Sequence, residues 1–490
     1  MLPTLIRQQF LSHLMSARFF AAVIIILLLV ASNTFVLIDE YERRLADYNV
    51  QKTVHREKAE AAETYSTLEL FIERPPNPLS LFSTGLEKQL GSTVEIYYSL
   101  VPLISNASAR YLANPFLNLF LKIDLAFIFQ VVLSLLALLF AYDAISGERE
   151  TGTLRILVSQ PVSRSSLLVG TYIGAMICLL LPLLLSLLLI LILLSTTSSI
   201  QLSPDDFLRI SGIFLTTIAY VSIFYLIGLL ISTISQRTAT SAMLCMFSWV
   251  VLVILYPTWS QFTMNPVGDT HAEKSSVERQ VNQIWEEVDR EKRRLVANSP
   301  LMGKPPWFNL TGKGGVAWGD GRYKVNLELD SQSEELVPHV QAYYKTISAL
   351  EIRLAKKTAL IREQSLERTD IQQSRWDELL MKLSPASLYR FATAAWVGTD
   401  LDGMLDFAKA TQKYHQALID YFYQEDAFAS RLWFASDKGI VDWSNLPQFH
   451  FDRKDVWVNA HRAIPELFVL FVLNLVLFGG TVQVFIRMDV

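Results

Sequence analysis

The amino-acid sequence predicts an all-α membrane protein with six transmembrane helices and a mainly helical domain outside the membrane. Hydrophobic residues make up 51% of the 490 residues and charged residues only 18%. The mean hydropathy is +0.30, which is more apolar than an ordinary soluble chain. A helix needs about twenty apolar residues to cross a hydrocarbon core roughly 30 Å thick. Six segments meet this requirement: 19–38, 125–142, 167–194, 210–234, 239–259 and 464–486.

Residues 1–18 are predicted to form an amphipathic helix on the membrane surface. Arg7, His13 and Arg18 alternate with apolar residues at a spacing that fits one helical face. The alternative is the charged start of a cleaved signal peptide. The apolar run that follows is too long for such a peptide, and no convincing cleavage site precedes Asp39. We therefore expect these residues to remain as an interfacial helix.

Basic residues near the spans predict the orientation, because short cytoplasmic loops are enriched in lysine and arginine. With the N-terminus inside, both termini lie in the cytoplasm, and the short loop 195–209 on the opposite side holds only Arg209. Two long polar segments, 39–121 and 261–463, then lie on the external side, and we expect them to build one extracytoplasmic domain. The cytoplasmic arginines would be Arg7, Arg18, Arg149, Arg155, Arg164, Arg237 and Arg487.

The two polar segments are predicted to be mainly helical. Charged residues alternate with apolar residues at helical spacing over most of their length, which is typical of solvated bundles or stalks and also fits a specific binding surface. Glycine and aromatic residues in 303–330 predict a small hairpin or loop. Helices are expected over 39–72, 275–297 and 334–383, from Ser384-Pro385 onward, and over 401–428.

The polar loop 143–166 between the second and third spans carries the densest set of candidate functional residues. Charged side chains at its start can pair with a partner, glycine permits close backbone approach, leucines offer an apolar contact and proline ends a helix. The last arginine anchors the next span. An ordinary juxtamembrane loop that satisfies the positive-inside rule has the same composition, so composition leaves both interpretations open. The residues are Glu148, Arg149, Glu150, Gly152, Thr153, Leu154, Leu157, Pro161 and Arg164.

The spacing of these residues resembles the signature of ABC-2 type transporter permeases. The matching pattern runs Glu148-x-Glu150-x-Gly152-Thr153-Leu154, followed by Leu157-x-Ser159-x-Pro161-Val162-Ser163-Arg164 and Gly170. In that family the pattern lies in the cytoplasmic loop between spans two and three. An N-terminal amphipathic helix and six spans are also family features.

The resemblance implies a fold of the ABC-2 exporter type and a permease that exports an unidentified cargo across a bacterial inner membrane. The loop would contain a coupling helix that fits a cleft in a separate ATPase subunit, so the nine residues named above would couple ATP hydrolysis to transport. The implied partners are ABC ATPase subunits, a second copy of this permease or a related permease, and the lipid bilayer. The large insertions 39–121 and 261–463 depart from common members. They resemble a bacterial subgroup with a domain of unknown function.

No sequence pattern predicts catalysis by this chain itself. It has no Gly-x-x-x-x-Gly-Lys-Ser/Thr phosphate loop, so ATP and Mg²⁺ would be bound by the partner ATPase and this chain would be a non-enzymatic subunit without a cofactor. His450, Asp452 and His461 are the one candidate metal cluster, and a wet interfacial loop is the alternative. A formal net charge of −4 gives no nucleic-acid signal.

Two other functions fit parts of the pattern. A mechanotransmitting ABC membrane subunit would use the helical insertions to act on a periplasmic partner without translocating cargo, although such proteins usually have four spans. A membrane-anchored sensor would use the external helices and would leave the loop at 143–166 without a purpose. We therefore expect a permease.

Overall fold

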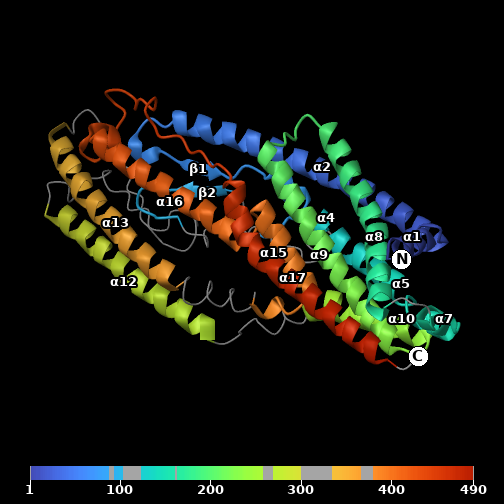
Figure 1. Cartoon of the computed structure of the whole chain (residues 1–490). Coiled ribbons are helices and arrows are strands. Elements are labelled where there is room, and N and C mark those ends of the chain that lie inside the picture. Colours follow the sequence, from blue (N-terminus) through green and yellow to red (C-terminus); the bar gives the residue numbers. More distant parts are fainter. Residues whose placement is uncertain are drawn as a thin grey trace.

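Six helical stretches of the structure are long and apolar enough to cross a membrane among the residues described, which confirms the predicted number of spans. The structure is a computed structural model that describes residues 2–87, 93–102, 123–159, 163–257, 269–298, 334–365 and 379–488. The spans gather at one end of the molecule, where both termini lie, and a mainly helical domain forms the other end (Figure 1).

Four of the spans are single helices, and two contain a π-helical turn. The second span consists of α4 (Leu125–Ile128), the π segment η5 (Phe129–Leu133) and α5 (Ser134–Ala141). The fifth consists of α10 (Thr238–Trp249) and the π segment η6 (Val250–Leu255). The single helices are α2 (Ala17–Glu60), α8 (Arg164–Ser195), α9 (Pro204–Ile234) and α17 (Val456–Arg487).

Helices α2 and α17 extend from the spans toward the domain. The 44 residues of α2 are about 66 Å long at 1.5 Å per residue, which is roughly twice the hydrocarbon thickness. The first span was predicted over 19–38 and a helix over 39–72, and in the structure one unbroken helix, α2, continues from the apolar run to Glu60. Likewise α17 begins at Val456 and contains the predicted span 464–486. Helix α2 thus reaches from the spans into the domain (Figure 1).

Helix α9 lies at the centre of the spans and packs against α5, α15 (Pro385–Val397) and α17. Its buried face carries large aromatic residues, and Tyr220 is stacked on Tyr389 of α15 with ring centroids 4.6 Å apart. The Tyr389 hydroxyl lies 3.1 Å from Thr217 Oγ1. Helix α15 was predicted as part of the external domain, because thirteen residues are too few for a span. In the structure it packs between two of the spans.

Backbone carbonyls in both π segments accept hydrogen bonds from side chains of other helices. The carbonyl of Gln130 in η5 accepts from the Tyr220 hydroxyl at 2.9 Å, and the carbonyl of Leu252 in η6 accepts from Ser384 Oγ at 2.6 Å. A π turn disturbs the regular helical ladder. These hydroxyls therefore satisfy groups that are costly to leave unpaired in an apolar environment.

The domain contains the helices α12 (Asp269–Ala297), α13 (Val337–Ser365) and α16 (Leu401–Gln424) and a two-stranded antiparallel sheet. Strand β1 (Leu70–Glu73) pairs with β2 (Thr93–Ile96) in the register Leu70↔Ile96. The core is separate from that of the spans and centres on Trp433, whose ring meets those of Tyr98, Phe422 and Phe428. Short 3-10 turns are η1 (Tyr65–Thr67), η2 (Pro78–Leu81), η7 (Glu334–Leu336), η9 (Ala427–Ala429) and η10 (Arg431–Trp433).

Several predicted helix limits in the domain are wrong. The predicted helix 39–72 ends at Glu60, and strand β1 replaces its last residues because alternating burial of Leu70 and Ile72 favours a strand. The predicted helix 401–428 ends at Gln424, and the residue Asp426 has a positive φ of 46°. The predicted helix 334–383 begins as a 3-10 turn and is described as helix to Ser365. The hairpin or loop at 303–330 lies outside the described residues.

The N-terminal helix α1 (Leu2–Leu14) packs along α8. Gly170 and Gly174 of α8 allow this close approach, because a Cβ at Gly174 would lie 2.8 Å from Cβ of Gln9 and 3.0 Å from the Ile6 carbonyl oxygen. The predicted interfacial helix is therefore a helix in contact with the third span.

Substitution of Gly212 tests the packing of α9 against α15. A Cβ at Gly212 would lie 2.5 Å from the Trp396 indole, so Gly212→Ala is expected to destabilise the protein by about 1–3 kcal/mol through overpacking. Gly480→Ala in α17 is the matched control, because a Cβ there meets nothing within 4 Å and helix propensity favours alanine. The measurement is the thermal midpoint in detergent. Equal midpoints for both variants would contradict the packing.

Candidate functional site

The loop between spans two and three forms two short helices joined by a glycine turn. Helix α6 (Ser146–Glu150) is followed by Gly152, whose φ of +75° lies in the left-handed region, and then by α7 (Thr153–Ser159). Only glycine adopts that backbone conformation without strain. Helix α7 therefore turns away from α6 and projects at the end of the molecule that holds both termini (Figure 1).

Helix α6 is fixed to the end of α9. The Ser232 hydroxyl accepts hydrogen bonds from the backbone N–H groups of Ile145 at 3.1 Å and Ser146 at 3.0 Å. These are unpaired donors at a helix N-terminus, and an oxygen acceptor satisfies them as a capping residue does. Ser232 is fully buried, so these two bonds attach the start of α6 to α9 away from solvent.

Two charged residues of α6 hold the connection between α9 and α10: Arg149 binds the C-cap residue of α9 and Glu150 binds the first residue of α10. Arg149 Nη1 donates to the Ser235 carbonyl at 2.9 Å. The Glu150 carboxylate accepts from the Thr238 backbone N–H at 3.0 Å and from its hydroxyl at 2.7 Å. Arg237, the N-cap residue of α10, makes no side-chain cap, so Glu150 supplies the cap from another helix.

The glycine turn is held by contacts within the loop. Thr153 Oγ1 donates to the Glu148 carbonyl at 3.2 Å and also bonds the Glu148 carboxylate. It lies 2.9 Å from the Thr151 hydroxyl. The predicted partner charges on Glu148, Arg149 and Glu150 are thus engaged inside the chain in this structure.

The surface of α7 is divided into a buried side and an exposed side. Leu154 is 1% exposed and belongs to the core of the spans. Ile156 is 63% exposed, and Arg155 beside it is also exposed. The Leu157 side chain and Pro161 lie outside the described residues. Among the described side chains of α7, Ile156 is the exposed apolar one, and the sequence reasoning did not select it.

Arginines connect the loop to two further spans. Arg164 Nη1 donates to the carbonyls of Ile486 and Met488 at 2.9 Å, at the C-terminal end of α17. Arg18 pairs with Asp143 at 2.9 Å and joins the start of α2 to the loop. The basic charge on Arg164 also complements the negative end of the α17 helix dipole. The loop thus contacts the ends of α2, α9, α10 and α17.

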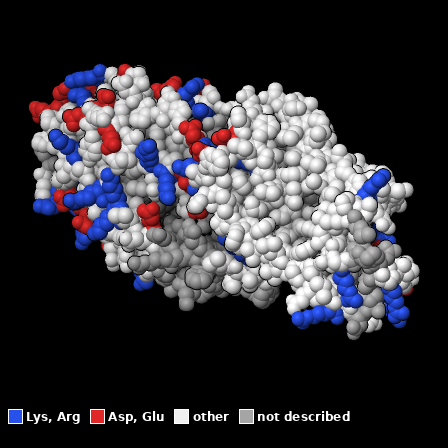
Figure 2. Space-filling view, viewed as in Figure 1, with Lys and Arg blue, Asp and Glu red and all other residues white. Residues whose placement is uncertain are grey.

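Charge is distributed unevenly along the molecule. On the face seen in Figure 2, mixed acidic and basic residues cover the domain, a broad uncharged band follows, and mainly Lys and Arg appear at the end that carries the loop. The band matches the surface expected for a lipid-facing region. The basic end matches the face that the positive-inside rule assigns to the cytoplasm.

A family sequence model described as "ABC-2 family transporter protein" matches residues 4–489, almost the whole chain. The chain belongs to the ABC-2 family of transporter proteins. This confirms the resemblance drawn from the loop residues and from the six spans. The family assignment also supports a non-catalytic membrane subunit that associates with an ABC ATPase subunit.

Two curated proteins are similar over short segments. The "Probable ABC transporter permease protein NosY" of Pseudomonas aeruginosa is 51% identical over 43 residues, which is 9% of this chain and 16% of that protein. The protein of the same name from Stutzerimonas stutzeri is 45% identical over 51 residues, 10% of this chain and 18% of its own length. The chain therefore spans less than a fifth of either relative in these matches.

The predicted site residues fall into two groups in the structure. Arg149, Glu150, Leu154 and Arg164 hold the loop against the spans, whereas Gly152 and Thr153 form the exposed turn with Glu148. The sequence reasoning missed Ser232, Thr238 and Ile156. Helical spacing would have indicated Ile156, because it lies two residues after the buried Leu154. Ser232 and Thr238 carry no local signal.

The described residues contain no group of three or more His, Cys, Asp or Glu residues placed to hold a metal ion. His450, Asp452 and His461, the candidate cluster from the sequence, are therefore not brought together as such a group.

Removing the Glu150 carboxylate tests whether it caps α10. Glu150→Ala is expected to raise amide hydrogen exchange several-fold at Thr238, because its backbone N–H loses the carboxylate acceptor. Arg155→Ala is the control in the same loop, since no side-chain partner of Arg155 is found among the described residues. Unchanged exchange in Glu150→Ala would refute the cap.

Proposed function

We propose that this chain is the permease subunit of an ATP-binding cassette transporter of a bacterial inner membrane and that it exports its cargo. The observation that carries the proposal is the α6–Gly152–α7 loop, an exposed element fixed to the ends of several spans. Membership in the ABC-2 family and the similarity to two proteins named as ABC transporter permeases support a permease subunit. ATP and Mg²⁺ would be bound by the separate ATPase subunit.

The docking surface for the ATPase comprises Gly152, Thr153, Arg155 and Ile156. An exposed isoleucine beside an arginine is a suitable contact, because buried apolar and arginine side chains contribute most of the energy at protein interfaces. The Glu148 carbonyl accepts a hydrogen bond from the Thr153 hydroxyl and so fixes the position of Thr153 in this surface. Movement of the bound ATPase would displace α7 first.

The anchoring contacts would carry that movement into the membrane. Glu150 would transmit it to α10, and Arg149 and Ser232 would transmit it to the C-terminal end of α9. Because both α9 and α17 run the full length of the spans, a shift at the loop would rotate or tilt helices that reach the domain. Such a rigid-body change alters access to a path beside the spans.

A complete path requires a second half-transporter, either another copy of this chain or a related permease. The helices α2 and α17 present large exposed apolar side chains that suit lipid or a second permease. They include Phe20, Ile24, Leu28 and Phe35 on α2 and Phe468, Phe471, Leu475 and Val476 on α17.

A second candidate function is mechanotransmission to a periplasmic partner without translocation of cargo. The observation that favours it is α2, which is one unbroken helix from Ala17 to Glu60 and thus couples the membrane end directly to the domain. Transport of cargo by the reconstituted complex would favour the permease function over mechanotransmission.

The ATPase docking surface is tested by Ile156→Asp. A charge in a buried apolar contact should weaken binding of the ATPase subunit at least about tenfold, while insertion and thermal midpoint stay unchanged. Ile440→Asp is the matched control, because Ile440 is 70% exposed but lies in the domain. Co-purification and ATPase stimulation are the readouts. Normal binding by Ile156→Asp would refute the surface.

The orientation is tested by cysteine labelling of intact cells. Both natural cysteines, Cys178 and Cys245, are buried, so single added cysteines report their own location. Lys438→Cys in the domain should react with a membrane-impermeant thiol reagent from outside, and Arg155→Cys should react only after permeabilisation. The reverse pattern would overturn the orientation.

A further inference from the structure

A cavity of about 300 Å³ lies where the domain meets the spans. Its walls come from the segment after β1, the C-terminal end of α15, the start of α16 and the segment that leads into α17. This volume is at the lower end of the range for small-molecule sites. The cavity is far from the α6–α7 loop, which lies at the other end of the spans (Figure 1).

Basic side chains outnumber acidic ones in the lining. Four cations and two carboxylates face this space: Arg74, Arg453, Lys454, Arg462, Asp406 and Asp452. Arg453 makes a bidentate ion pair with Asp206, with N···O distances of 2.8 and 3.0 Å, and this carboxylate also pairs with Arg209. The remaining basic groups determine what the cavity can bind.

Arg74 is buried, and no carboxylate among the described residues lies within ion-pair distance of it. It is 7% exposed, its Nη1 donates to the sulfur of Met404 at 2.8 Å, and its guanidinium lies over the rings of Phe407 and Phe451. Burial lowers the pKa of this guanidinium, and the more distant carboxylates of Glu87 and Asp400 partly offset that effect. A thioether is a weak acceptor, so a buried cation here lacks strong oxygen acceptors.

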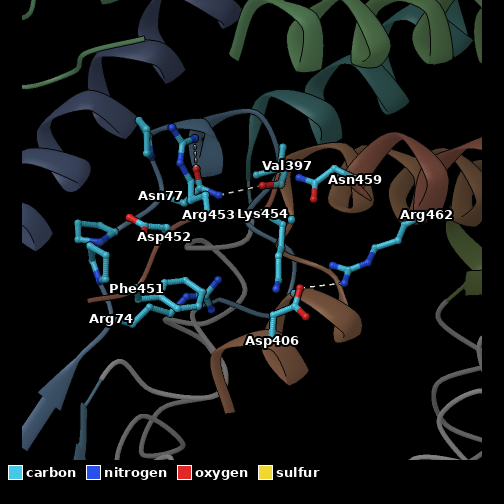
Figure 3. Close-up of a pocket in the computed structure, with 15 residues that line it drawn as sticks. Arg74, Asn77, Val397, Asp406, Phe451, Asp452, Arg453, Lys454, Asn459 and Arg462 are labelled. Atoms are coloured by element: carbon cyan, nitrogen blue, oxygen red, sulfur yellow. Dashed lines mark hydrogen bonds and ion pairs between the residues drawn. The ribbon is translucent and has the colours of Figure 1, made fainter. Parts of the chain in front are cut away.

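The cationic groups of Arg462 and Lys454 also have N–H donors that can bind a ligand. Arg462 Nη2 donates to Asp406 at 2.8 Å, but its Nη1 is buried without a hydrogen-bond partner among the described residues. Lys454 has no carboxylate within 4.0 Å in the described part of the chain, and its residue is exposed. In Figure 3 the side chains of Arg74, Lys454 and Arg462 extend from different elements toward the same space, with Asp452 on the opposite side from Lys454 and Arg462.

We propose that this cavity binds a phosphate-type oxyanion, carried either by a phospholipid headgroup or by a free phosphate monoester. A phosphate offers oxygen atoms in several directions and so accepts from three separate cationic donors, whereas a carboxylate offers only two oxygens. The cavity has room for the phosphate and a short polar group. Its position at the ends of α9 and α17 places it near the membrane surface, where headgroups lie.

Binding there would connect the domain to the spans. Asn77, next to Arg74, donates to the Val397 carbonyl of α15 at 2.9 Å, and Arg453 joins the segment before α17 to Asp206 of α9. The site does not depend on the ATPase docking surface, because none of its residues lies in the α6–α7 loop.

The test uses the full-length protein in phosphate-free detergent micelles and calorimetric titration with glycerol 3-phosphate. Lys454→Met should weaken binding about tenfold or more, the loss expected for a hydrogen bond to a charged group. Lys438→Met, an exposed lysine elsewhere in the domain, is the matched control and should bind as the wild type does. Arg74→Met should also lose binding, and Lys454→Met decides the result if Arg74→Met fails to fold.

A second arm distinguishes the two sources of phosphate. Native mass spectrometry of protein from nanodiscs with phosphatidylglycerol should show a retained lipid that Lys454→Met loses, if the headgroup is the ligand. If glycerol 3-phosphate binds in the calorimetric titration but no lipid is retained, the ligand is a free phosphate monoester. Absence of both, or equal binding by wild type and Lys454→Met, overturns the proposal. Ile156→Asp should leave phosphate binding unchanged. Failure of the proposed ATPase docking surface can therefore be distinguished from failure of the proposed phosphate site.

Discussion

Helix α9 is the element on which the arrangement of the spans depends, because it is packed on most sides and held by polar contacts at both ends. Asp206, fully buried near its start, pairs with Arg209 at 2.9 Å and with Arg453. Ser232 near its end binds the backbone of α6. Removing the Asp206 carboxylate would leave the buried Arg209 guanidinium without its counter-ion, which costs several kcal/mol. The 31 residues of α9, about 46 Å long, therefore connect the α6–α7 loop to the region of the cavity at the domain.

The sequence predicted the spans well because a membrane demands long apolar runs, and those runs are visible without tertiary information. Charged residues after Ile38 do not interrupt the helix, so α2 carries the first apolar run and continues to Glu60 as one element. Helix α15 is too short to be recognised as a neighbour of α9, and the short strand β1 depends on pairing with β2, which lies beyond a proline-rich segment.

The candidate site was located by its spacing, but the roles of its residues were not predictable. Whether Glu150 faces a partner or caps a helix depends on Thr238, 88 residues away. The same holds for the cavity, where Arg74 meets Met404 across 330 residues of chain. The charge pattern of the sequence indicates that polar groups gather at a membrane edge. Which of these groups form ion pairs, and which keep N–H donors without a partner, depends on contacts that exist only in the folded chain.

The π turns η5 and η6 have a mechanical consequence. Each turn holds an additional residue in the helical ladder, so its conversion to regular α-helix would lengthen the helix by about 1.5 Å and rotate one end by about 100° relative to the other. The two turns flank a hydrogen bond between Trp249 Nε1 and Ser134 Oγ of 2.9 Å. The hydroxyls of Tyr220 and Ser384 donate to carbonyls inside these two turns, so these bonds favour the π geometry over the regular α-helix in spans two and five.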